Sequence, residues 1–191
     1  ILAKYLHDLG YILFFQDNPE LNDTVILDPQ WVSENISKVL ENADIKNGLG
    51  RFTAEHMKQC WQGKYINTHI RHVFLRLMEQ FDLSYRCQDG LVATKTNDSI
   101  VSLIVERLSY DIPKGEDSYE PVWEAKSNFP EIRMKFKLHS NLPPGIPTWF
   151  IARTHQFTTD KHWRYGALLS DTPEQKHLGL IRADEHKRYV E

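Results

Sequence analysis

Cysteine is scarce in this chain of 191 residues, which contains only Cys60 and Cys87. The two form no metal-binding motif, and so few cysteines exclude a disulfide-stapled scaffold. We therefore expect both thiols to be reduced, as in a cytoplasmic protein, with Cys60 as a small core residue rather than a nucleophile. No apolar run approaches the roughly 20 residues that a membrane-spanning helix needs, so the sequence predicts no membrane span.

An excess of positive charge is also missing. The chain has 23 basic and 26 acidic residues, which gives a formal net charge of −3. Contacts to phosphates dominate affinity for nucleic acids, and proteins that bind them are usually basic. The composition therefore disfavours nucleic acid as a partner.

Motifs for nucleotide and catalytic chemistry are absent from the sequence. It contains no Gly-x-x-x-x-Gly-Lys-Ser/Thr loop, no Gly-x-Gly-x-x-Gly and no kinase signature. Two sets of side chains could suggest a metal, namely the pair His69 and His72 and the group His155, Asp160 and His162. Such histidines more often lie on the surface and bond to solvent. We expect no catalytic residue, cofactor or metal, and keep a metal-dependent enzyme as the least favoured alternative.

The best-defined stretch runs from residue 6 to residue 31. Gly10 follows an apolar helical pattern and is placed to end that helix, whose apolar face we expect to pack on the protein. Residues 11–15 predict a strand covered on both faces, and residues 25–27 predict a second strand. Asp28-Pro29 is a strong helix start, because Asp28 can cap the first turn and Pro29 lacks the N–H that the helix could not use.

The rest of the first half predicts a winged helix. Helical spacing continues from Pro29 to about residue 42, Thr53 caps a short helix, and a longer helix follows with a broad apolar face. Residues 83–95 predict a hairpin whose turn, Asp89-Gly90, would place Cys87 opposite Val92 and Tyr85 opposite Thr94. A unit made of a short helix, a longer helix and a hairpin can bind DNA, and here Arg71 and Arg76 would face outward on the longer helix. The same unit can instead serve as a protein-interaction module.

The second half predicts an antiparallel sheet with a packed helix, so the whole chain is assigned to the α+β class. Residues 131–138 alternate in the manner of a half-buried strand, with Arg133, Lys135 and Lys137 on the polar face. Pro147 can begin a helix, and residues 162–169 and 177–183 have strand character. Residues 100–108 fit either helix or strand. We place the domain boundary between residues 96 and 97, which gives units 1–96 and 97–191.

Several stretches together resemble the COR domain, which follows the Roc Ras-like GTPase in Roco proteins, a family that includes the leucine-rich-repeat kinases. The resemblance is strongest at residues 6–10, 14–17 and 27–31, continues through residues 75–83 and 90–92, and returns at Leu142-Pro143, Arg153, His155 and residues 163–166. The chain opens at Ile1 without an initiator Met and ends at Glu191 in a strand-like stretch. We therefore expect a piece of a larger protein, with the second half possibly truncated.

The resemblance implies a non-catalytic regulatory module with two functions. Its first half would contact a Roc GTPase domain of the same chain, and GTP and Mg²⁺ would bind to that neighbour. Its second half would form a homodimer. The implied GTPase-facing residues are Phe15, Gln16, Val25, Leu27 and Trp31, with Val25 where related kinases carry an aromatic. The basic strand face and possible interface anchors suggest a dimer or partner surface made by Arg133, Lys135, Trp163, Arg164 and Tyr165.

Overall fold

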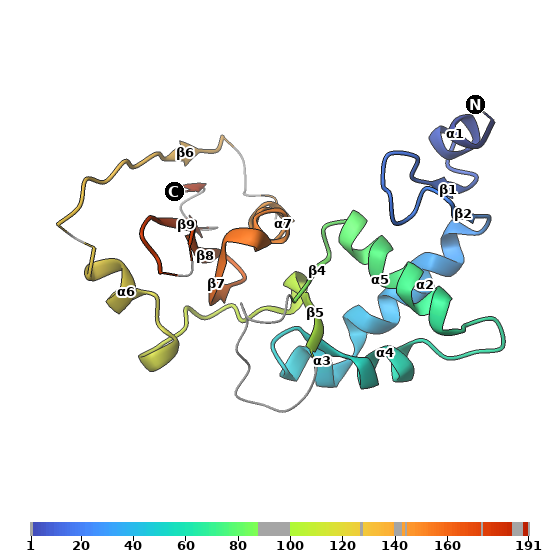
Figure 1. Ribbon diagram of the computed structural model, residues 1–191, viewed down its shortest axis with the longest axis horizontal. Coiled ribbons are helices and arrows are strands. Elements are labelled where there is room, and N and C mark those ends of the chain that lie inside the picture. The colour runs from blue at the N-terminus through green and yellow to red at the C-terminus, as the bar shows by residue number, and fades with distance from the viewer. Residues whose placement is uncertain are drawn as a thin grey trace.

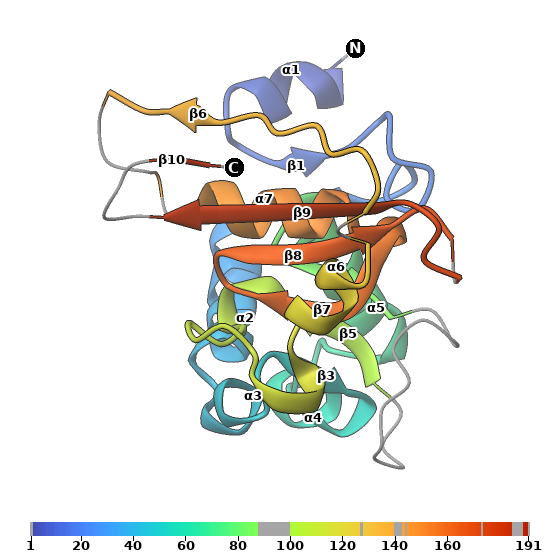
Figure 2. The same cartoon turned by 90° about the vertical axis from the view of Figure 1, so that its left-hand side faces the viewer.

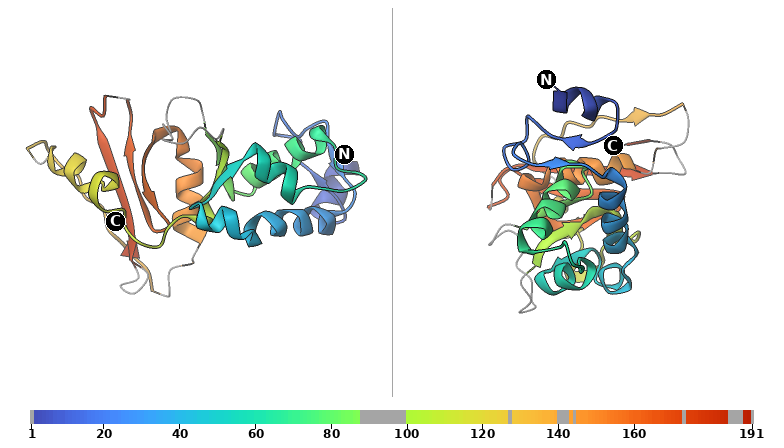
Figure 3. Two further views of the ribbon diagram at one scale, coloured as in Figure 1. Left: turned by 90° about the horizontal axis from the view of Figure 1, so that it is seen from below. Right: turned by 90° about the vertical axis from the view of Figure 1, so that its right-hand side faces the viewer.

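The computed structural model describes residues 2–87, 100–126, 128–139, 143, 145–172, 174–184 and 189–190. A mainly helical half and a half built on an antiparallel sheet lie side by side along the long axis of the molecule (Figures 1 and 3). The predicted α+β class is confirmed. Within the described residues, no helix is both long and apolar enough to cross a membrane.

The chain begins with a short helix and a small hairpin, in the elements α1 (Leu2–Asp8), β1 (Leu13–Phe14) and β2 (Val25–Ile26). Gly10 has a φ of +78° and ends the helical stretch, as predicted. β1 and β2 pair antiparallel, with Leu13 opposite Ile26. Two predictions are wrong here: α1 buries none of its described residues, and Tyr11 is 68% exposed rather than covered.

Four helices and the residues between them form the core of the first half. These helices are α2 (Pro29–Glu41), α3 (Ala43–Asn47), α4 (Ala54–Cys60) and α5 (Thr68–Gln80). The predicted caps are confirmed: Asp28 accepts the Trp31 N–H at 3.2 Å, and Thr53 accepts the His56 N–H at 3.2 Å. The most deeply buried side chains include Val32, Val39, Ile45, Phe52, Trp61, Phe74, Leu77 and Met78.

A three-stranded sheet closes one end of this helical core. Its strands are β3 (Arg51–Thr53), β4 (Ser84–Arg86) and β5 (Ile100–Ile104), with β5 in the centre. Within the stretch 100–108, residues 100–104 therefore form a strand, and a 3₁₀ turn, η1 (Val105–Arg107), follows. Leu103 of β5 lies opposite Tyr85. The turn predicted at Asp89-Gly90, and the partners predicted at Val92 and Thr94, lie outside the described residues.

The second half has a five-stranded antiparallel sheet between two helices. Its strand order is β6 (Phe136–Lys137), β10 (Tyr189–Val190), β9 (Leu178–Asp184), β8 (Gly166–Ser170) and β7 (Thr158–Trp163). The longer helix, α7 (Gly145–Arg153), covers one face and the short helix, α6 (Glu120–Glu124), lies on the other (Figures 2 and 3). Two short 3₁₀ turns, η2 (Gly115–Asp117) and η3 (His155–Phe157), complete this half.

Three strand predictions can be compared with this sheet. The strand predicted over residues 177–183 is confirmed as β9. The single strand predicted over residues 162–169 is instead a hairpin, because the chain turns at Arg164 and Tyr165 between β7 and β8. The strand predicted over residues 131–138 is wrong for residues 131–135, because a strand needs a ladder partner and β10 pairs only with Phe136 and Lys137.

A shared hydrophobic cluster joins the two halves. The first half contributes Tyr85, Leu103, Val105 and Leu108, and the second contributes Ile151, Ala152 and Ala167. Tyr85 also stacks on the ring of His155, with centroids 5.3 Å apart. Because these side chains are almost fully buried, their contact holds the sheet half against β4 and β5.

Candidate protein-docking surface

Exposed apolar side chains gather on α1 and the β1–β2 hairpin, which lie next to each other at one end of the molecule (Figure 1). They are Leu2, Tyr5, Leu9, Tyr11, Val25 and Leu27. Single exposed apolar residues are ordinary on protein surfaces, but several of them on neighbouring elements make a candidate interaction site. Of the predicted docking residues, Val25 is 45% exposed and Leu27 is 78% exposed, so both are available for contact.

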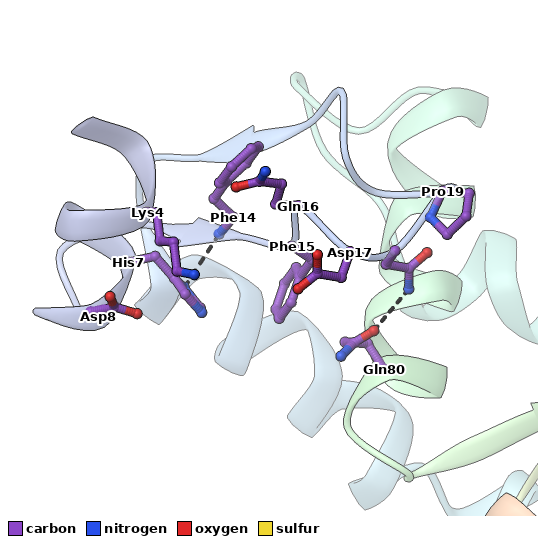
Figure 4. Close-up of a pocket in the computed structure, with 10 residues that line it drawn as sticks. Lys4, His7, Asp8, Phe14, Phe15, Gln16, Asp17, Pro19 and Gln80 are labelled. Atoms are coloured by element: carbon purple, nitrogen blue, oxygen red, sulfur yellow. Dashed lines mark hydrogen bonds between the residues drawn. The ribbon is translucent and has the colours of Figure 1, made fainter. Parts of the chain in front are cut away.

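An open groove of about 590 Å³ borders the same hairpin (Figure 4). Its walls come from α1, the β1–β2 hairpin and the end of α5, and its lining includes both aromatic and charged side chains: Lys4, His7, Asp8, Phe14, Phe15, Gln16, Asp17, Asn18, Pro19 and Gln80. The predicted residues Phe15 and Gln16 both lie in it. A groove with this mixed lining suits the side chains of a protein partner better than a purely apolar ligand.

Aromatic contacts fix the position of Phe15. Its ring lies 5.4 Å from the His7 ring and 5.9 Å from the Phe81 ring, both in edge-to-face arrangements. The Trp31 ring packs on Phe74 with centroids 4.9 Å apart. Phe15 and Trp31 are therefore half-buried against the hydrophobic core.

The loop of the hairpin is tied to α5 and β4 by polar side chains. The Asn18 amide donates to Gln80 Oε1 at 2.8 Å. Glu20 pairs with Arg86 through two hydrogen bonds and with Arg76 Nε at 3.3 Å. Glu79 accepts from both arginines, and burial raises the pKa of its carboxyl above the ordinary value despite these charges. The side chains of Glu20, Arg76, Glu79 and Arg86 form one network that orients the hairpin on the helical core.

The same contacts bear on the nucleic-acid alternative. Arg76 is occupied by Glu20 and Glu79, and Arg71 Nε donates to the Trp61 carbonyl at 3.0 Å. Both arginines that could have faced phosphates are thus engaged inside the protein. A basic surface for duplex DNA would need such side chains to be available.

The residues predicted for a second partner surface come from different segments and differ in exposure. Trp163 is 3% exposed and stacks on Tyr119, with ring centroids 5.3 Å apart. Tyr165 is half-buried with its ring 5.9 Å from Tyr110. Arg133 and Lys135 lie in the exposed segment before β6, and Arg133 lines a groove together with Tyr119.

Arg164 lies at the joint between the two halves rather than on an outer surface. Its Nη2 donates to Glu106 Oε2 at 2.6 Å, and its Nη1 donates to the Glu106 backbone carbonyl. Glu106 Oε1 also accepts from the Thr148 hydroxyl at 2.7 Å. One carboxylate therefore connects η1, α7 and the β7–β8 turn. A second ion pair across the halves joins Arg153 Nη2 to Asp82 Oδ2 at 2.7 Å.

We expect Arg164→Ala to lower the free energy of unfolding by about 2 kcal/mol, because it leaves a half-buried carboxylate without its charged partner. The matched control is Arg133→Ala, whose ion pair with Glu131 is largely exposed and should contribute less than about 0.5 kcal/mol. Urea denaturation of both variants measures the difference. Equal stabilities would contradict the assignment of Arg164 to the joint.

The surroundings of the histidines and cysteines bear on whether these residues could form a metal site or act as a nucleophile. The described residues contain no group of three His, Cys, Asp or Glu side chains that could hold a metal ion. His155 stacks on Tyr85, and its Nδ1 lies 2.8 Å from the Ala152 carbonyl oxygen, while the side chain of Asp160 lies outside the described residues. Burial raises the pKa of Cys87 to about 11 and also raises the pKa of Cys60, so neither thiol is activated as a nucleophile near neutral pH.

Comparison with known proteins identifies the family. The family model of the C-terminal of Roc, COR-A domain, matches residues 1–106, and the C-terminal of Roc, COR-B domain, matches residues 130–191. The chain belongs to the COR family. The COR-A match includes β5, whereas the boundary predicted from the sequence falls between residues 96 and 97, inside that match.

The relatives of this COR domain are large proteins. It is 29% identical over 99 residues to the probable serine/threonine-protein kinase pats1 and 37% identical over 84 residues to the probable serine/threonine-protein kinase qkgA, both from Dictyostelium discoideum. These matches cover 52% and 44% of this chain but only 3% and 5% of the relatives. A Roc-COR-CHAT protease from Runella zeae is 21% identical over 97% of this chain and 18% of its own length. The chain thus spans a small part of each relative.

The structure exposes apolar residues that the sequence predicts to be covered. Leu2 and Tyr5 of α1 and Leu9 just after it lie on one apolar face, and an amphipathic pattern alone assigns such a face to the core. The continuous apolar run of residues 11–15 likewise predicts a covered strand that includes Tyr11. The sequence shows the apolar pattern, but it does not show that Leu2, Tyr5, Leu9 and Tyr11 stay exposed in the folded chain.

Proposed function

We propose that this COR domain is a non-catalytic regulatory module, and that it docks onto a Roc-type GTPase domain of the same cytoplasmic protein. The family description, C-terminal of Roc, and the printed name of the Runella relative both support a Roc neighbour. GTP and Mg²⁺ would bind to that neighbour, which would also hold the groups that transfer the phosphoryl group. The COR domain would act through its interface, by setting the relative position of the domains.

The observation that carries this proposal is the exposed apolar group on α1 and the β1–β2 hairpin. A stable protein interface has an apolar centre and a polar rim. Here Val25 and Leu27 provide apolar contact, and the groove beside them provides polar and charged groups. The network of Glu20, Arg76, Glu79 and Arg86 holds the hairpin in one orientation, which lowers the entropy cost of binding.

We further propose that the second half contributes to a homodimer. Trp149 and Phe150 of α7 are 47% and 37% exposed, while Ile151 and Ala152 of the same helix are buried against the joint. Aromatic side chains of this kind are favoured as interface anchors. Arg133 and Lys135 would add basic groups to this half, and Trp163 would support it from inside.

The Val25→Asp variant tests the docking proposal. We expect its affinity for the isolated Roc GTPase domain of the same protein to fall about 10- to 100-fold, because the interface would bury an unpaired carboxylate. Isothermal titration calorimetry measures the dissociation constant, and circular dichroism verifies the fold.

The matched control for this variant is Tyr65→Asp. Tyr65 is 76% exposed but lies between α4 and α5, away from the hairpin, so the same charge there should leave the affinity unchanged. Wild-type binding by a folded Val25→Asp protein would remove Val25 from the interface. Equal losses for both variants would instead indicate an effect of net charge.

A further inference from the structure

An apolar cavity of about 190 Å³ lies between α7 and the sheet of the second half. Its walls come from α7, from the paired strands β6 and β10, and from the strands β8 and β9 with the turn before β8. The lining residues are Phe136, Ile146, Pro147, Phe150, Tyr165, Gly166, Ile181, Ala183 and Val190. Protein interiors are close-packed and rarely leave a void larger than a water molecule, so a cavity of this size calls for an explanation.

Small residues on the sheet side account for the space. Gly166, at the start of β8, has no side chain, and Ala183, near the end of β9, has only a methyl group. Gly166 has no room for a larger residue, because a Cβ there would lie 2.5 Å from the Ile181 backbone oxygen. On the helix side, the buried Pro147 contributes a short ring. The helix therefore packs on the sheet without filling the space between them.

The chemistry of the wall decides what kind of molecule the cavity accepts. Among the lining residues only Tyr165 has a polar side-chain group, and the surface of the cavity is apolar throughout. A charged or hydrogen-bonding group that entered would lose its hydration without gaining a partner. Apolar cavities of this kind stay dry and take apolar guests instead of water. The wall therefore favours an uncharged apolar molecule.

The volume of the cavity sets the size of that molecule. Pockets for drug-sized ligands measure about 300–1,000 Å³, so such ligands do not fit. An apolar protein cavity of about 150 Å³ is large enough to bind benzene. The cavity beside α7, at about 190 Å³, therefore has room for one benzene ring with a small substituent.

Two aromatic rings provide a way in. Phe136 is 60% exposed and Phe150 is 37% exposed, although both line the cavity, so each ring borders solvent on one side and the cavity on the other. Exposed side chains change rotamer within picoseconds to nanoseconds. A small molecule can therefore enter past these rings without unfolding of the sheet.

We propose that this cavity is a binding site for one small, uncharged aromatic molecule of about the size of toluene. The ring would lie between α7 and the side chains of Ile181 and Ala183. Because α7 is bonded to Glu106 through Thr148 and to Asp82 through Arg153, a bound molecule would also hold the joint between the halves in place. The proposal rests on the cavity alone and is independent of the proposed GTPase surface and homodimer.

Titration of the chain with toluene tests the proposal, with the amide NMR signals of Gly166 and Ala183 as the readout. We expect saturable shifts with a dissociation constant on the order of 0.1–1 mM, as expected for the transfer of one such ring from water into an apolar site. Since toluene would bind only the folded chain, a concentration of three times this constant should also raise the midpoint of thermal unfolding by about 2 °C.

Substitutions at one wall position make the test specific. Ala183→Leu places a larger side chain in the cavity and should weaken toluene binding at least about tenfold. Ala183→Val adds one carbon fewer and should give an intermediate loss, which also covers the case in which leucine disturbs β9. The matched control is Ala125→Leu, at an exposed position that ends α6 on the other face of the sheet, and it should leave the affinity unchanged.

Three outcomes would overturn the proposal. Shifts at Gly166 and Ala183 that do not saturate up to the solubility limit of toluene would show that the cavity is not a binding site. Equal affinities for Ala183→Leu and Ala125→Leu would place the bound molecule elsewhere. An affinity for toluene that falls as the protein concentration rises would assign the cavity to an apolar side chain of a second copy.

Discussion

The Trp61→Ala variant is expected to lose about 4 kcal/mol of unfolding free energy. Trp61 is fully buried, with its ring 5.4 Å from Phe52 and 5.3 Å from Phe74. Its indole N–H donates to the Asn35 carbonyl at 3.0 Å, which links α2 to the end of α4. Alanine would leave a large cavity and a buried carbonyl without its donor. Urea denaturation followed by circular dichroism measures the change.

Trp149→Ala is the matched control for this loss. Trp149 is 47% exposed on α7, so the same substitution should cost about 1 kcal/mol or less in the monomer. Measurements at low protein concentration keep any dimer contact out of the comparison. Similar losses for the two variants would contradict the central place of Trp61 in the core. A large loss at position 61 would also disturb α5, which holds the docking hairpin.

Gly50→Ala is expected to cost about 3 kcal/mol, from two separate effects. Gly50 has a φ of +83°, a conformation that disfavours residues with a Cβ atom. A Cβ at this position would also lie only 2.4 Å from the backbone oxygen of Ile104. That oxygen belongs to β5, whose Ile104 N–H donates to the Gly50 carbonyl at 2.8 Å, so the central strand would have to shift.

Gly10→Ala separates the two effects. Gly10 has a similar φ of +78°, but a Cβ there meets nothing within 4 Å. We expect it to cost about 1 kcal/mol, the conformational penalty alone. Thermal unfolding of both variants gives the difference, which measures the clash with β5. No difference between them would mean that β5 moves away from position 50 without cost.

The elements that the sequence predicts well are those with local signals. Asp28-Pro29 and Thr53 mark helix starts through contacts within one turn, and Gly10 marks a helix end through its own backbone conformation. The strand character of residues 177–183 predicts β9, whose ladder partner β8 is the preceding strand in the chain. In each case the decisive interaction lies within a few residues along the chain.

The features that the sequence does not predict depend on partners distant in the chain. The apolar face of α1 looks like a core face, and only the assembled structure shows it exposed. Residues 131–135 alternate like a strand, but their ladder depends on β10, more than fifty residues later. Arg164 looks like a surface anchor, yet its carboxylate partner, Glu106, approaches only after the halves have packed together.

The candidate docking surface also combines features that the sequence predicts with features that depend on distant partners. Val25 and Leu27 were selected through a family resemblance rather than from their chemistry, and they are exposed as a docking role requires. Phe15 and Trp31 were selected in the same way, but their packing on Phe81 and Phe74 could not be read from their positions in the sequence. A docking surface is made of ordinary apolar residues, so it has no motif of its own.

The end of α5 has a consequence for the distance between the two proposed interfaces. Gln80 bonds to Asn18 of the hairpin loop, Phe81 contacts Phe15, and the next residue, Asp82, pairs with Arg153 of α7. Three consecutive residues thus touch the β1–β2 hairpin on one side and α7, the helix that carries Trp149, on the other. If the hairpin docks a GTPase as proposed, the end of α5 would act as a fixed-length spacer between that GTPase and the second half.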